Sequence, residues 1–206
     1  MRGAVFLPLL TGTLSSACVW ERSLLCPCVQ PDGYVDPTCQ VCFGKGRYFD
    51  PPSSSFQCGV VNLSAKALEA IQQRFGPGMK GDSQMSIPFT APCYAEINEG
   101  DRVAVTTAVD VVEWSLAPGD QIKLPFGYSG LDAKVRNPAG DTVLTTPFPV
   151  PGAGGRVTVT VPTALRFSAP RRYEVLKELS HTRGFSTGEG LPKKMLLSLI
   201  DWTVRW

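Results

Sequence analysis

Apolar and polar residues alternate with a period of two through most of the chain after residue 84, the pattern of half-buried β-strands. The runs are Val103, Val105, Val109 against Arg102, Thr106, Asp110, and Val157, Val159, Val161 against Arg156, Thr158, Thr160. Glycine- and proline-rich turn signals separate these runs at intervals of about ten to fifteen residues. The pattern predicts a mainly β protein, an antiparallel β-barrel or sandwich.

A single stretch has helical periodicity. Leu68, Ile71 and Phe75 lie at i, i+3 and i+7, so they share one face of a predicted helix over 65–75. Ser64 is a suitable N-cap, and Gly76-Pro77 ends the pattern. Nothing in this segment indicates chemistry, so we predict a helix that packs against the β-domain.

The two ends of the chain are apolar without being helical. We predict that residues 1–24 form an extended arm, since their apolar residues have no helical period and no cap. Ile200, Trp202, Val204 and Trp206 would form one face of a last strand. Together with the loop at 180–190, these segments are predicted to contact other chains. The remaining predicted parts are a cysteine module at 25–50, a linker and helix at 51–82, and the β-domain at 83–206.

Composition narrows the function classes. The 206 residues carry a net charge of +2, so neither a general polyanion-binding surface nor specific nucleic-acid binding is predicted. The only histidine, His181, has no nucleophile motif around it, and we predict no catalytic site and no enzyme. Arg166, Arg171 and Arg172 are interpreted as a solvated rim or as inter-subunit ion pairs. No stretch has the length of a membrane span.

Four of the seven cysteines lie close together in the sequence. Cys26 and Cys28 form a C-x-C pair, and Cys39 and Cys42 form a C-x-x-C pair that is followed by Gly44-Lys45-Gly46. Two such pairs at the ends of a short loop are typical of a tetrahedral zinc site, for which thiolates are suitable ligands. With four sulfur ligands the site would be closed and structural, and the glycines would let backbone amides turn toward the sulfurs.

Other interpretations of the cysteines remain open. An iron–sulfur cluster is less favoured than zinc, and disulfides are disfavoured by the odd number of cysteines. Cys58 is a reserve ligand, while Cys93 is predicted to pack as a small buried apolar residue. The segment before Cys18 mimics a lipoprotein signal, although its short apolar run contains Pro8.

The run Cys-Pro-Cys, then Asp-Pro-x-Cys-x-x-Cys-x-Gly-x-Gly, resembles half of the zinc domain of DnaJ-type chaperones, where the unit is repeated. Its position ahead of a β-rich domain looks closer to small structural proteins of tailed bacteriophages. That resemblance implies a virion protein of the neck or head-to-tail connection, assembled in the host cytoplasm. It also implies a ring of copies that contacts connector, portal-side or tail proteins. The alternatives are a nucleic-acid-binding zinc protein, a chaperone-like peptide-binding module and an exported lipoprotein.

Overall fold

The computed structural model describes residues 15–39, 41–42, 44–122, 129–136, 142–144, 157–160, 162–179 and 192–200. Residues 1–14, the loop at 180–190 and the segment from 201 onward therefore lie outside it, as do the predictions made for them. The described chain is mainly β with one helix, as the sequence pattern predicts. Its elements are β1 (Ser16–Glu21), β2 (Ser23–Leu25), β3 (Arg47–Phe49), β4 (Phe56–Asn62), α2 (Ala65–Phe75), β5 (Ser83–Ile87), β6 (Arg102–Leu116), β7 (Gln121–Ile122), β8 (Ser129–Arg136), β9 (Thr142–Leu144), β10 (Val157–Thr158), β11 (Thr163–Glu178) and β12 (Lys193–Leu199).

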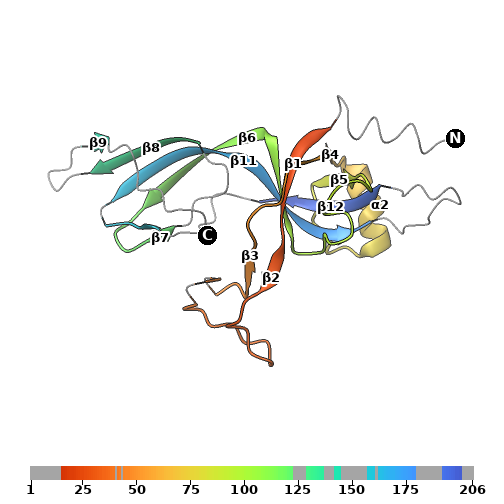
Figure 1. The fold of residues 1–206 in the computed structure, drawn as a ribbon, viewed down its shortest axis with the longest axis horizontal. Coiled ribbons are helices and arrows are strands. Elements are labelled where there is room, and N and C mark those ends of the chain that lie inside the picture. Colours follow the sequence, from red (N-terminus) through yellow and green to blue (C-terminus); the bar gives the residue numbers. More distant parts are fainter. Residues whose placement is uncertain are drawn as a thin grey trace, which may run out of the picture. The chain divides into compact units, whose positions relative to one another are not determined.

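Six strands close into an antiparallel barrel (Figure 1). The hydrogen-bonded order is β12-β5-β4-β1-β6-β11, and a further pairing of β12 with β11 closes the ring. Closure leaves the barrel without an edge strand, and its interior is filled by apolar side chains from alternate positions. The fully or almost fully buried residues on these strands include Cys18, Cys58, Met85, Ile87, Val103, Val105, Val175, Met195 and Leu197.

The chain divides into two compact units. The barrel unit consists of residues 1–107 and 172–200, and the second unit of residues 108–171 and 201–206. The second unit has its own core, in which the rings of Trp114 and Phe167 meet edge to face at 4.9 Å. The other members of this core are Val112, Leu116, Ile122, Val159, Leu165 and Ala169.

The long strands β6 and β11 belong to both units. In the barrel part of β6 the consecutive residues Val103, Ala104 and Val105 are all buried, whereas in the second unit buried and exposed residues alternate, with Val112 and Trp114 buried. The predicted shared face of Val103, Val105 and Val109 is wrong at Val109, which is 56% exposed.

The helix begins and ends where the sequence predicts. The Ser64 hydroxyl accepts a hydrogen bond from the Ala67 amide, so Ser64 is the N-cap of α2. Gly76 follows the last helical residue with a φ of 108°, and its amide donates to the carbonyl oxygen of Gln72. The predicted apolar face, formed by Leu68, Ile71 and Phe75, is half-buried.

The predicted boundaries need correction at three places. Residues 16–21, assigned to the arm, form β1, which pairs with β4 on one side and β6 on the other. Residues 56–62, assigned to the linker, form β4, and the predicted domain at 83–206 is divided between two units. β1 was missed because adjacent residues, Cys18 and Val19, are both buried, so a strand covered on both faces does not alternate.

Each of the three predicted rim arginines forms an ion pair within the chain, and the predicted solvated rim is wrong for Arg172, which is buried. Arg166 pairs with Glu113 at 3.4 Å, Arg171 with Asp110 at 2.8 Å and Arg172 with Glu21 at 3.0 Å, all within the chain. The third pair is buried, since both side chains are less than a tenth exposed. The sequence could not show these ion pairs, because the carboxylate of each pair lies on another strand than its arginine.

Candidate metal centre

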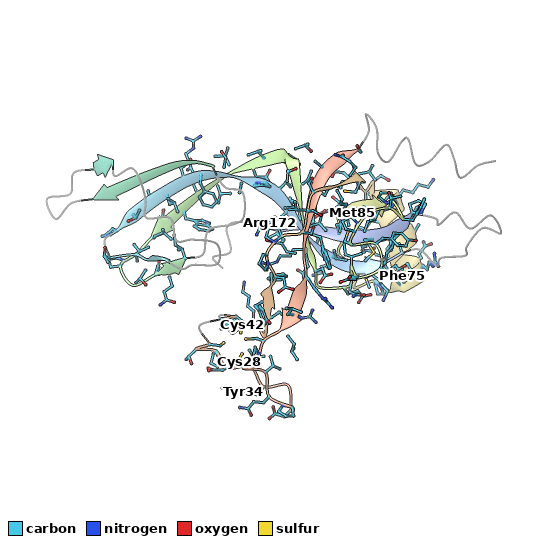
Figure 2. The ribbon with its side chains drawn as sticks, in the orientation of Figure 1. Cys28, Tyr34, Cys42, Phe75, Met85 and Arg172 are labelled. Atoms are coloured by element: carbon cyan, nitrogen blue, oxygen red, sulfur yellow. The ribbon has the colours of Figure 1, made fainter. Side chains whose placement is uncertain are left out.

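The cysteine module is carried by a two-stranded ribbon. β2 pairs antiparallel with β3, from Ser23 opposite Phe49 to Leu25 opposite Arg47. The Cys26 amide continues the ladder by donating to the Gly46 carbonyl oxygen at 2.8 Å. Residues 26–46 are therefore a loop whose two ends are held side by side, and the loop contains all four candidate ligands. Figure 2 shows Cys28 and Cys42 near the ribbon and Tyr34 farther out in the loop.

Asp101 joins this ribbon to the barrel. Its buried carboxylate accepts hydrogen bonds from the Trp20 indole at 2.8 Å, the Ser23 amide at 2.8 Å and the Asn98 amide at 2.9 Å. A buried carboxylate needs such donors, because burial removes its water. The Arg102 guanidinium also lies 3.5 Å from the centre of the Phe49 ring. The start of β2 and the end of β3 are thus both fixed to the barrel.

The four predicted ligands are brought together. The sulfurs of Cys26, Cys28, Cys39 and Cys42 all lie within 4.8 Å of one another. The Sγ–Sγ distance is 3.7 Å between Cys26 and Cys39 and 3.4 Å between Cys28 and Cys42. A disulfide requires about 2.0 Å, and all seven cysteines are free thiols. Four thiolates at about 2.3 Å from a tetrahedral ion would lie about 3.8 Å apart, so the arrangement fits a metal ion.

Backbone amides point at three of the sulfurs, and the Cys28 amide donates to that of Cys26. The amides of Cys42 and Val41 donate to the Cys39 sulfur, and this lowers the pKa of the Cys39 thiol to about 6. The Gly46 amide donates to the Cys42 sulfur at 3.3 Å. Gly46 has a φ of 72°, and a Cβ there would lie 3.0 Å from Cγ2 of Val35. The predicted role of the glycine pair is confirmed at Gly46, where only glycine fits without strain.

A turn ahead of Cys39 sets its position. The Asp36 carboxylate accepts hydrogen bonds from the Thr38 amide at 2.8 Å and the Thr38 hydroxyl at 2.7 Å. The same two bonds lower the pKa of Asp36. The Cys39 amide in turn donates to the Asp36 carbonyl oxygen at 3.2 Å. This Asp-Pro-Thr-Cys turn explains how the second pair folds back on the first.

The other three cysteines lie in the barrel. Cys18, Cys58 and Cys93 are fully buried, and Cys58 lies on β4 beside β1 rather than at the metal centre. Its pKa is raised by a hydrogen bond with Cys18 and by burial. Burial raises the pKa of Cys93 to about 12. Cys93 therefore packs as predicted, and a fully buried Cys18 does not fit a lipidated residue.

Among the residues that the structure describes, the four-cysteine cluster is the only group of three or more metal-binding side chains close enough to share an ion. His181 lies outside these residues. Sequence reasoning missed the role of Asp101 in holding the ribbon to the barrel, and it missed the contact between Arg102 and Phe49. The only related signal in the sequence was the predicted turn at 98–101. No helix in the described segments has the length and apolarity needed to cross a membrane.

The comparisons with known proteins add no relative: no protein-family model matches the chain, and no curated protein matches it.

Proposed function

We propose that Cys26, Cys28, Cys39 and Cys42 hold a structural zinc ion that maintains the fold of residues 26–46. The observation that carries this proposal is the set of four sulfurs within 4.8 Å, with amide donors on three of them. Four protein ligands leave no position for water or substrate, which favours a structural over a catalytic ion.

The module has little else to hold it together. Its fully buried side chains among the described residues are those of Cys26 and Cys42, and its tip residue Tyr34 is 55% exposed. Among the described residues of the module, six backbone hydrogen bonds outside regular strands connect positions within 26–46, at about 1 kcal/mol each. A structural zinc ion contributes about 10–16 kcal/mol, so the ion would be the largest stabilising term in the module.

Elemental analysis of the purified chain tests this proposal directly. We expect one zinc and no iron per chain, and a Cys39→Ser variant with strongly reduced zinc content. Cobalt substitution should give the sulfur-to-metal charge-transfer band of a four-thiolate site. A chain with iron and acid-labile sulfide would instead show an iron–sulfur cluster, and a chain without metal would refute both forms of the site.

We further propose that the protein is a structural component of a tailed-phage virion, in a ring at the neck or head-to-tail connection. Its support is the resemblance of the cysteine module to phage structural proteins and the closed barrel to which that module is attached. The module also exposes apolar side chains of the kind that subunit contacts cover, namely Leu25 at 69%, Val41 at 56% and Tyr34 at 55%. The expected neighbours are copies of the chain and connector, portal-side or tail proteins.

Localisation in particles tests the virion proposal. Purified particles from the producing phage should contain the chain in a stoichiometry that corresponds to one or a few rings, measured by quantitative mass spectrometry. A chain lacking residues 1–14, which keeps strand β1 intact, should be soluble and folded but absent from particles, because the predicted arm supplies subunit contacts. Full-length chain that is missing from purified particles would contradict the proposal.

A further inference from the structure

One edge of β6 has no strand beside it among the described residues. β1 pairs with β6 only from Arg102 to Val105, whereas β6 continues to Leu116. The other neighbour of β6 is β11, on the opposite side. From Thr107 to Glu113 the described part of the chain therefore leaves one row of β6 backbone groups open to an additional strand.

The two central exposed side chains of this stretch are apolar, between the exposed polar residues Thr107 and Glu113. Val109 is 56% exposed and Val111 is 60% exposed, while the alternate residue Val112 is buried in the second core. Exposed β-branched residues beside an open edge favour the addition of another strand, and proteins normally cover or charge such edges. The edge therefore has the properties of a β-augmentation site.

The arm of the same chain leaves β6 before this edge begins. The Thr106 hydroxyl donates to the Ala17 carbonyl oxygen at 3.0 Å, so a side chain occupies the place where the β1–β6 ladder would continue. The next residues toward the N-terminus pair on the other side, with Ser16 opposite Cys58 and the Ser15 hydroxyl bonded to the Gln57 side chain at 2.9 Å. These contacts direct the start of the described chain toward β4.

The sequence before Ser15 has the composition that the edge requires. Leu9-Leu-Thr-Gly-Thr-Leu14 follows Pro8 and contains no charge. Six residues in strand conformation extend about 20 Å, and the seven residues from Thr107 to Glu113 extend about 23 Å. In such a strand Leu10 and Leu14 would share one face, where the two exposed valines of β6 need cover.

We propose that the segment Leu9–Leu14 of a second copy of the chain adds as a strand to the open edge of β6, from Thr107 to Glu113. This inference rests on the proposed ring assembly and specifies its contact. In a ring each copy would donate its arm to one neighbour and accept an arm from the other, a head-to-tail contact that closes when the ring is complete.

Cross-linking between isotopically distinct copies tests the donor and the acceptor together. A photoreactive benzoylphenylalanine replaces Val111, and the assembled protein is formed from an equal mixture of light and nitrogen-15-labelled chains. Irradiation should join position 111 to the peptide Gly3–Arg22 of the other isotope. A probe at Val61, an equally exposed valine on the barrel strand β4, is the control and should not capture that peptide. Cross-links within one copy, or to another segment, would overturn the inference.

Substitutions separate this contact from the assembly proposal itself. Val111→Lys places a charge beside the edge and should abolish oligomers in analytical ultracentrifugation, whereas Val111→Thr, which keeps a β-branched residue, and Val61→Lys should leave them intact. Circular dichroism melting establishes that each variant is folded. If truncation of residues 1–14 abolishes assembly but Val111→Lys does not, the arm binds elsewhere and only this inference fails. A full-length chain that stays monomeric at every concentration would contradict ring assembly as well.

Discussion

The buried ion pair between Glu21 and Arg172 gives a sharp test of how the barrel is held together. Both residues are 6% exposed, and Arg172 Nη2 lies 3.0 Å from Glu21 Oε1. At an effective dielectric constant of about 20, the attraction at this distance is about 5.5 kcal/mol. Desolvation of the two charges is of the same size, so the pair as a whole adds little net stability. Removal of one partner, however, leaves the other charge buried without this ion pair.

We therefore expect Glu21→Met or Arg172→Met alone to lower the free energy of unfolding by about 3–5 kcal/mol. The double variant should recover most of this loss, because two apolar side chains then replace the pair. Urea denaturation followed by circular dichroism and by tryptophan fluorescence measures each free energy, and coincident transitions show whether the two units unfold together.

The exposed pair Glu113–Arg166 on the second unit is the matched control. Its side chains are 70% and 61% exposed, and the same cycle there should give a coupling of about 0–1 kcal/mol. A loss below about 1 kcal/mol for either single variant at the buried pair would refute the reasoning, as would equal couplings at both pairs.

Three further predictions concern cysteine and glycine chemistry. In the folded, metal-loaded chain no cysteine should react quickly with iodoacetamide. After the metal is removed with a chelator, mass spectrometry should find alkylation at the four module cysteines and protection at Cys18, Cys58 and Cys93. Early modification of the three barrel thiols would contradict separate cores. Gly46→Ala should weaken metal retention against a chelator. The control is Gly33→Ala, where φ is also positive but a Cβ meets no atom within 4 Å; equal effects would refute the steric argument. Because burial raises the pKa of Cys93 from about 9 to about 12, the unfolded thiol ionises first, so wild-type stability should fall as pH rises through this range. Cys93→Ala should show a smaller fall, and parallel pH profiles would contradict this assignment.

Local signals in the sequence were sufficient for the helix and the cysteine cluster. The N-cap at Ser64, the periodicity up to Phe75 and the glycine that follows are all contained in one stretch of chain, so they predict α2 correctly. The four cysteines lie within one short loop, where spacing alone restricts their geometry. In both cases the residues that interact are near one another in the sequence.

The features that were missed depend on distant residues. The burial of Cys18 and Val19 on β1 depends on β4, β6 and the elements that cover them, which no local pattern reports. The exposure of Val109 was missed because β6 passes from one core to the other, and the alternation of Val103, Val105 and Val109 gave no sign of two cores. Asp101 resembled an ordinary turn residue, and its three donors come from three separate segments.

The passage of β6 and β11 through both units makes the second unit an insertion in the barrel. Residues 108–171 leave the barrel from β6 and return to it in β11, and in the barrel these two strands are antiparallel neighbours. A tight turn joining residue 107 to residue 172 would thus convert them into an ordinary hairpin without altering the strand order of the barrel. We expect the same barrel to accept other insertions at this connection, because the bonds from Asp101 that hold the cysteine module lie outside it.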